Sequence, residues 1–165
     1  MDWWFFREGT EAEARDYLAR FLDEGAAWAA GLEPGADLSP ASVPEVIARV
    51  AGEVELVDAS PPAGAPDWVR DVVSEHGVGF RDLAESSRAC VLRAAYYLGA
   101  SFVTTYPVLR WELGAPDTPA VRQPVITGFG TGDDLAVLGA AEALLAGGDA
   151  AAAVAGWRAA VAGQR

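Results

Sequence analysis

The chain has 165 residues, of which 52% are hydrophobic, and its 24 acidic and 12 basic side chains give a net charge of −12. This length and composition predict a single domain, 1–165, that buries a substantial core. Direct binding to nucleic acid or to an anionic membrane is not expected, because phosphate contacts depend on Lys and Arg and every basic residue here is an arginine outnumbered by acids.

The acidity is concentrated in the N-terminal third. Residues 1–60 hold 13 acidic and 4 basic side chains, whereas residues 61–165 hold 11 and 8. Such a surface is typical either of a binding face for a basic partner or of a solvated helical face that maintains solubility. Both interpretations remain open at the level of the sequence.

The single cysteine, Cys90, excludes an internal disulfide bond, and the chain does not begin with a positively charged segment followed by an apolar run. The first apolar run, 3–6, is four residues long, far shorter than a membrane span. We therefore expect a cytoplasmic protein without a membrane-spanning segment.

Two helices are predicted in the acidic third. Thr10 and Glu13 have the spacing of a capping box, and apolar residues then recur every three or four positions as far as Gly31. Ser42 and Glu45 repeat the capping-box spacing and predict a shorter helix that continues through 50. The run 53–56 alternates charged and apolar residues and fits either the end of that helix or a short strand.

The segment 59–66 is rich in Pro, Ala and Gly and is predicted to be a connector. Within the single domain it would join an N-terminal helical sub-lobe, 1–58, to a C-terminal α+β part, 66–165. A short helix is predicted over 67–76 and the longest helix over 80–105, in which Gly99 is expected to admit a close neighbour.

A β-hairpin is predicted after this central helix. Apolar and charged residues alternate over 109–113, which predicts a half-buried strand with Arg110 and Glu112 facing outward. The antiparallel partner is predicted to begin at Pro124, so that the hairpin comprises 108–113 and 124–129. A helix from 131 or 133 to Gly147 and an Ala-rich helix capped by Asp149 complete a predominantly helical α+β domain.

No complete catalytic or metal-binding arrangement is present. The Gly-rich run 128–132 resembles a phosphate loop in outline, but Asp133 and Asp134 would repel an anion and a P-loop lysine is missing. His76 is the only histidine that could activate a nucleophile such as Cys90. We expect no catalytic residue, no intrinsic metal and no cofactor.

Aromatic residues are the better candidates for binding. Trp3, Trp4 and Tyr97 are not clearly assigned to the core by the apolar pattern, and Trp, Tyr and Arg commonly anchor protein interfaces. For Trp3 and Trp4 the alternative is a strand or cap laid over the core. A different candidate site is a pocket between the central helix and the sheet, lined by Tyr97, Arg110, Glu112 and Asp133.

The block 96–141 carries Tyr-Leu-Gly on the central helix, Leu-Arg-Trp-Glu-Leu-Gly on the first strand of the hairpin and Gln-Pro-Val-Ile-Thr-Gly-Phe on the second. It resembles a family of small bacterial proteins of unknown function that is common in actinobacteria. The resemblance implies a soluble, helix-rich α+β domain and supplies no functional residues.

Two functions are compatible with these features. The first is a non-enzymatic acidic interaction protein, such as an immunity protein or an adaptor, that binds a basic protein partner. The alternative is a small-ligand-binding protein or an enzyme with its pocket between the central helix and the sheet. A deep polar pocket would favour the second function, and a flat or convex acidic face would favour the first.

Overall fold

The computed structural model describes residues 6, 9–32, 37–59 and 80–163, and it confirms the predicted helical α+β fold. The helices in these ranges are α2 (Glu11–Ala30), α3 (Val43–Ala51), α5 (Arg88–Thr105), α6 (Val137–Leu145) and α7 (Ala150–Ala162). The strands are β1 (Leu56–Ala59), β2 (Phe80–Leu83), β3 (Arg110–Leu113), β4 (Pro124–Thr127) and β5 (Leu135–Ala136).

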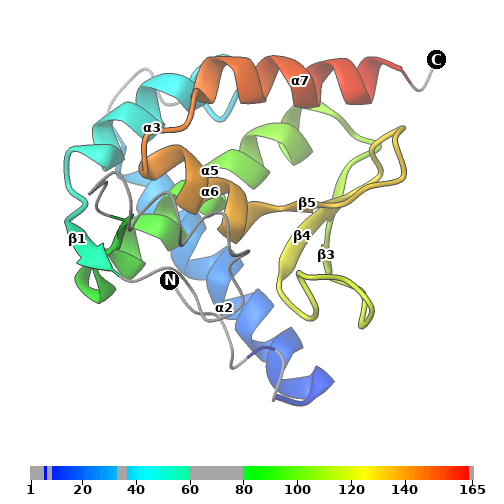
Figure 1. Cartoon of the computed structure of the whole chain (residues 1–165). Coiled ribbons are helices and arrows are strands. Elements are labelled where there is room, and N and C mark those ends of the chain that lie inside the picture. Colours follow the sequence, from blue (N-terminus) through cyan, green and yellow to red (C-terminus); the bar gives the residue numbers. More distant parts are fainter. Residues whose placement is uncertain (1–5, 7–8, 33–36, 60–79, 164–165) are drawn as a thin grey trace.

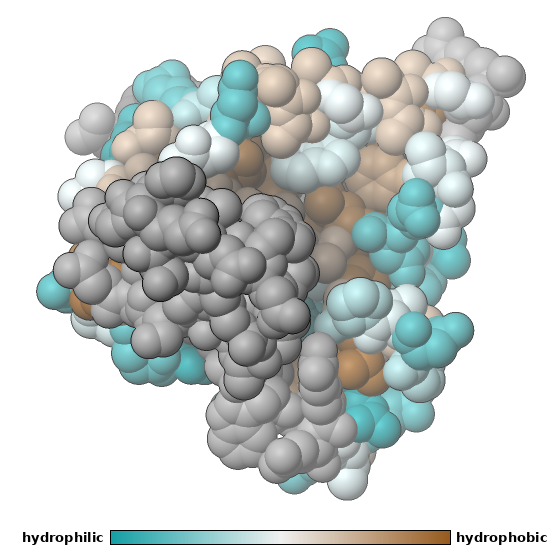
Figure 2. Space-filling model, viewed as in Figure 1, coloured by the Kyte–Doolittle hydropathy of each residue, from teal (hydrophilic) through white to brown (hydrophobic). Residues whose placement is uncertain are grey.

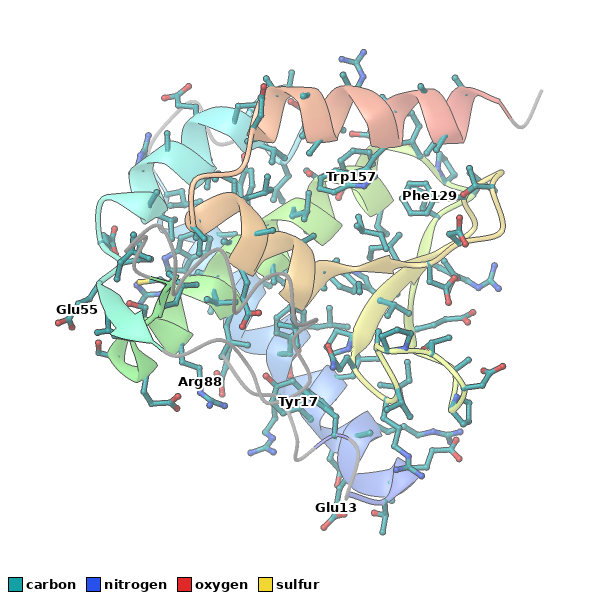
Figure 3. All side chains as sticks on the ribbon, viewed as in Figure 1. Glu13, Tyr17, Glu55, Arg88, Phe129 and Trp157 are labelled. Atoms are coloured by element: carbon teal, nitrogen blue, oxygen red, sulfur yellow. The ribbon has the colours of Figure 1, made fainter. Side chains whose placement is uncertain are left out.

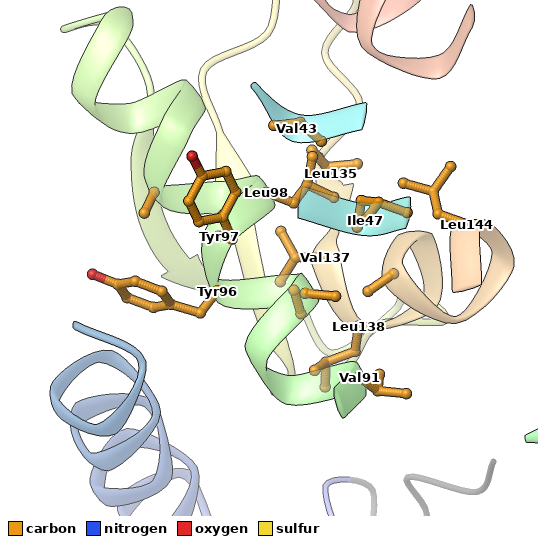
Figure 4. Packing of buried hydrophobic residues seen from close by; sticks show 14 of the residues in the cluster. Val43, Ile47, Val91, Tyr96, Tyr97, Leu98, Leu135, Val137, Leu138 and Leu144 are labelled. Atoms are coloured by element: carbon orange, nitrogen blue, oxygen red, sulfur yellow. The ribbon is translucent and has the colours of Figure 1, made fainter. Parts of the chain in front are cut away.

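Helix α5 is the centre of the fold. Helices α2, α3 and α6 all pack against it, and α2 and α7 lie on opposite sides of it (Figure 1). Its residues from Ala94 to Phe102 are buried without interruption, because helices and the β3–β4 hairpin cover it on several sides. Figure 4 shows how side chains of α3, α5 and α6 meet in this core.

The start of the central helix differs from the prediction. Phe80–Leu83 is not helical: it forms β2 and pairs antiparallel with β1, with Leu56 opposite Leu83. The pairing continues past the strands, because the Ala84 N–H donates to the Glu55 carbonyl at 2.8 Å and the Glu55 N–H donates to the Ser87 hydroxyl at 2.8 Å. These bonds hold the backbone extended, so α5 begins only at Arg88, after a single 3₁₀ turn (Glu85–Ser87).

The predicted hairpin is confirmed with shorter strands, 110–113 and 124–127. Arg110 pairs with Thr127 and Glu112 pairs with Val125 in antiparallel register. A third strand, β5, pairs with β4 where the prediction placed the start of a helix, and α6 begins only at Val137. The physical reason is that β4 is buried along its whole length, so its backbone groups need partners on both sides.

Three helix starts were predicted from capping residues, and all three are confirmed, two of them with the predicted side-chain cap. Thr10 and Glu13 form the expected reciprocal capping box, and the Asp149 carboxylate accepts from the Ala152 N–H at 2.9 Å. Ser42 does not cap α3 with its side chain. Its hydroxyl donates instead to the Ser39 carbonyl at 2.8 Å and is shared with a tyrosine of α5, so the second predicted capping box is wrong.

The predicted connector 59–66, apart from Ala59, and the predicted helix 67–76 lie outside the described residues. The division into a sub-lobe 1–58 and a part 66–165 therefore stays a prediction. Within the described ranges, no helix combines the length and the apolar character needed to cross a membrane.

Candidate functional site

Tyr97 belongs to the core. Its side chain is 0% exposed, and its hydroxyl accepts from the Leu38 N–H at 3.2 Å and is hydrogen-bonded to the Ser42 hydroxyl at 2.8 Å. Figure 4 shows Tyr97 projecting from α5 next to Tyr96. The structure therefore uses this tyrosine to join α5 to the turn before α3, and not to line a surface pocket beside the sheet.

The other three residues of the predicted pocket lie near one another at the sheet. Arg110 and Glu112 form an ion pair on β3, and exposed Asp133 precedes β5. The pKa of the neighbouring Asp134 is raised, mainly because its carboxyl is partly removed from water. The negative charges of Glu112 and Asp133 raise this pKa further, and Arg110 lowers it. Both aspartates line a shallow groove of about 520 Å³ together with polar Thr118 and Gln123.

The described residues around this groove include carboxylates but no histidine or cysteine. No group of three or more His, Cys, Asp or Glu side chains within the described ranges is placed to hold a metal ion. Cys90 is 8% exposed, and this burial raises the pKa of its thiol. The negative charge of Glu53 raises the pKa further, and the positive charge of Arg93 lowers it. A raised pKa reduces the reactivity of the thiol as a nucleophile. His76 lies outside the described residues.

Trp3 and Trp4 also lie outside the described residues, so their proposed role stays a prediction. Phe6 is the one described residue of that segment, and its ring meets the ring of Tyr17 edge-on with centroids 4.8 Å apart.

The exposed face of α2 is acidic. Its exposed charged residues comprise five acids and two arginines: Glu11, Glu13, Asp16, Asp23, Glu24, Arg15 and Arg20. Glu11 is paired with Arg15, and Glu13 is engaged in the capping box. No carboxylate–arginine contact within ion-pair distance involves Asp16, Asp23 or Glu24 in the part of the chain that the structure describes. All three carboxylates lie on the exposed face of α2.

Helix α7, on the other side of α5, has a very different surface. Arg158 is the only charged residue within Ala150–Ala162. Figure 2 shows the surface over α7 mainly in pale and brown colours, with few strongly hydrophilic residues. The fold thus separates an acidic face on α2 from a nearly neutral face on α7.

A groove of about 360 Å³ runs between α2 and the first half of α5. Its apolar lining is mostly aromatic, and charged side chains stand beside it; the lining residues are Tyr17, Arg20, Phe21, Glu24, Gly25, Trp28, Ala89, Leu92 and Arg93. We call this the α2–α5 groove. Tyr17 and Trp28 belong to the apolar residues that recur along α2, and both are only half-buried.

The electrostatics of this groove are set by side chains from both helices. The Arg93 guanidinium lies over the Trp28 ring, 5.8 Å from its centroid, and is 3.7 Å from the Glu53 carboxylate. Burial raises the pKa of Tyr17 to about 12, with Arg88, Glu24 and Arg20 as its charged neighbours. Figure 3 shows Tyr17 on α2 and Arg88 at the start of α5 on neighbouring helices.

Comparisons with protein-family models, with curated proteins and with solved structures gave no match. The resemblance of the block 96–141 to a family of small actinobacterial proteins therefore rests on the quoted residues alone. The chemistry of the chain itself is the basis for any functional proposal.

Proposed function

We propose that the protein is a non-enzymatic interaction protein, such as an immunity protein or an adaptor, whose acidic α2 face binds a basic protein partner. The observation that carries the proposal is the row of exposed carboxylates on α2, of which Asp16, Asp23 and Glu24 have no ion-pair partner among the described residues. A partner that supplies Lys or Arg would complete these pairs.

The expected contribution of these carboxylates is mainly kinetic and selective. An exposed ion pair contributes about 0.2–1 kcal/mol, so three of them do not by themselves hold a complex together. A face with an excess of one charge sign raises association rates by roughly 10- to 1,000-fold and repels partners of the same sign. Because exposed charges are screened over roughly 8 Å at physiological ionic strength, the association is expected to weaken as salt rises.

The test is affinity capture of the tagged protein from cells of its source at low and at moderate salt, with bound proteins identified by mass spectrometry. The test variant reverses Asp16, Asp23 and Glu24 to arginine. The control variant reverses Glu45, Glu85 and Asp117, exposed acids that lie off α2, and so makes the same change in net charge.

A stoichiometric basic partner that is retained by the wild type and the control variant, and lost by the α2 variant, is the expected result. Equal loss from both variants would mean that only net charge matters. Recovery of the bare protein at both salt concentrations would contradict a stable complex.

The alternative is a small-ligand-binding protein or an enzyme. Its pocket was predicted between the central helix and the sheet, whereas the groove beside the sheet is lined by no described residue of α5. The observation that favours it is the pair Asp133 and Asp134 on that groove, with the raised pKa of Asp134. Such a site would suit a small organic cation. Thermal-shift measurements with simple amines test it, since stabilisation that is lost in Asp134→Asn supports the alternative, and no stabilisation by any amine argues against it.

A further inference from the structure

We propose that the α2–α5 groove is the anchoring subsite of the acidic face, and that it takes one large apolar side chain from a basic helical segment of the partner protein. This inference rests on the proposed function, because it requires a basic partner on α2. The inference specifies where on the α2 face the partner binds and what kind of side chain it inserts there.

The groove is large enough to take a bulky apolar side chain. Its volume of about 360 Å³ lies near the lower limit of the range of about 300–1,000 Å³ found for small-molecule sites. Gly25 contributes backbone to its lining, and a Cβ at this position would lie 2.2 Å from the ring of Tyr96. Tyr17, Phe21, Trp28 and Leu92 supply its apolar lining.

The composition of the groove is that of an interface anchor point. Trp, Tyr and Arg are the residues whose truncation most often weakens protein complexes, and they cluster where a partner side chain is fully desolvated. Trp28 and Tyr17 both line the groove and are half-buried. Arg93 lies over Trp28 and beside Glu53, which holds this guanidinium against the groove.

The charges beside the groove define the partner. Arg20 and Glu24 line the groove itself, and Asp16 and Asp23 lie one helical turn from Arg20 on either side of it along α2. None of the four has an ion-pair partner among residues 9–32, 37–59 and 80–163. Together they carry a net negative charge, so a segment with Lys or Arg around its apolar residue is complementary, whereas Arg20 disfavours a base directly opposite itself.

The same charges argue against other occupants. A second copy of this chain would bring another net charge of −12 to an acidic face. A small anion would meet Arg20 and Arg93 in the groove, but Arg93 is already paired with Glu53. The carboxylates of Glu24, Asp16 and Asp23 would repel the anion. A basic segment with an apolar anchor satisfies both the aromatic lining and the charges.

The experiment measures the binding of two fluorescent synthetic helical peptides to the full chain by anisotropy. One peptide consists of Leu and Lys with the leucines along one face, and the other has Ala in place of each Leu, so both have the same charge. Ala89→Phe fills the groove from an exposed position on α5. Ala26→Phe is the control, because Ala26 is exposed on α2 and does not line the groove.

We expect the Leu/Lys peptide to bind at least about 10-fold more tightly than the Ala/Lys peptide, as for an interface anchor. Ala89→Phe should abolish this difference, and Ala26→Phe should preserve it. Glu24→Gln should weaken binding of the Leu/Lys peptide and Arg20→Gln should strengthen it, each by about two- to fivefold, the size of an exposed ion pair.

Equal binding of the two peptides, or an unchanged difference in their affinities in Ala89→Phe, would contradict the anchoring role of the groove. The proposed binding of a basic partner by the acidic face would still stand. Absence of binding by both peptides would overturn the acidic face as well. If Ala89→Phe does not fold, the indole N–H resonance of Trp28, assigned with Trp28→Phe, decides: it should shift with the Leu/Lys peptide and not with the Ala/Lys peptide. A shift with neither or with both would overturn the proposal.

Discussion

Replacement of Gly99 by alanine is expected to destabilise the protein, although alanine is the better helix former. Gly99 lies on the side of α5 that meets the hairpin, and a Cβ there would lie 2.1 Å and 2.4 Å from two ring atoms of Trp111. The indole cannot easily move away, since it stacks on Tyr96 with ring centroids 6.4 Å apart and meets Phe21 edge-on at 5.6 Å. These contacts join α2, α5 and β3.

Two opposing contributions determine the size of the effect. Alanine in place of glycine stabilises a helix by about 1 kcal/mol. Forcing extra volume into a packed core costs about 1–3 kcal/mol, and a contact this short belongs at the upper end of that range. The net loss in the free energy of unfolding is therefore about 2 kcal/mol, which corresponds to a fall in Tm of roughly 4–8 °C for a chain of this size.

The assay is equilibrium urea unfolding of the wild type and of Gly99→Ala, followed by the circular dichroism of the helices. Gly156→Ala is the matched control, because Gly156 lies within α7 and a Cβ there meets no atom within 4 Å. This variant should gain about 0.5–1 kcal/mol from helix propensity alone. If Gly99→Ala is as stable as Gly156→Ala, the indole is not held in place and the reasoning is refuted.

Three further predictions concern single side chains. Tyr97→Phe should lower the free energy of unfolding by about 1–2 kcal/mol, since the Leu38 N–H loses its hydrogen-bond partner. A loss below a few tenths of a kcal/mol in urea unfolding would contradict this. Asp149→Ala should cost about 1 kcal/mol by uncapping α7, and Asp149→Asn should retain most of that stability in the same assay. Because burial raises the pKa of Tyr17 to about 12 and an unfolded tyrosine ionises near 10, its contribution to stability is complete below about pH 10 and is lost between about pH 10 and 12. Tyr17→Phe should therefore lose less stability than the wild type between about pH 10 and 12, and an identical pH dependence of the two proteins would contradict the assignment.

The candidate site could be predicted only in part. The alternation of apolar and charged residues correctly placed Arg110 and Glu112 together on the exposed side of β3, because this pattern depends on near neighbours. Tyr97 was assigned to the same pocket, but its hydroxyl is bound by Leu38 and Ser42, more than fifty positions away along the chain. No periodicity within one segment indicates such a contact.

The sequence by itself determined the features that depend on short-range periodicity and capping: the helix from Thr10 to Gly31, the start of α7 at Asp149, the hairpin and the acidic charge of α2. Only the tertiary structure decided that Phe80–Leu83 is a strand, that β5 completes the sheet, and that a groove lies between α2 and α5. The physical reason is one of distance along the chain. A strand requires a partner backbone and a groove requires two facing surfaces, and for β2 and the groove these come from segments that are far apart in the sequence. Strand β5, with 2 residues, is too short to show a period of its own.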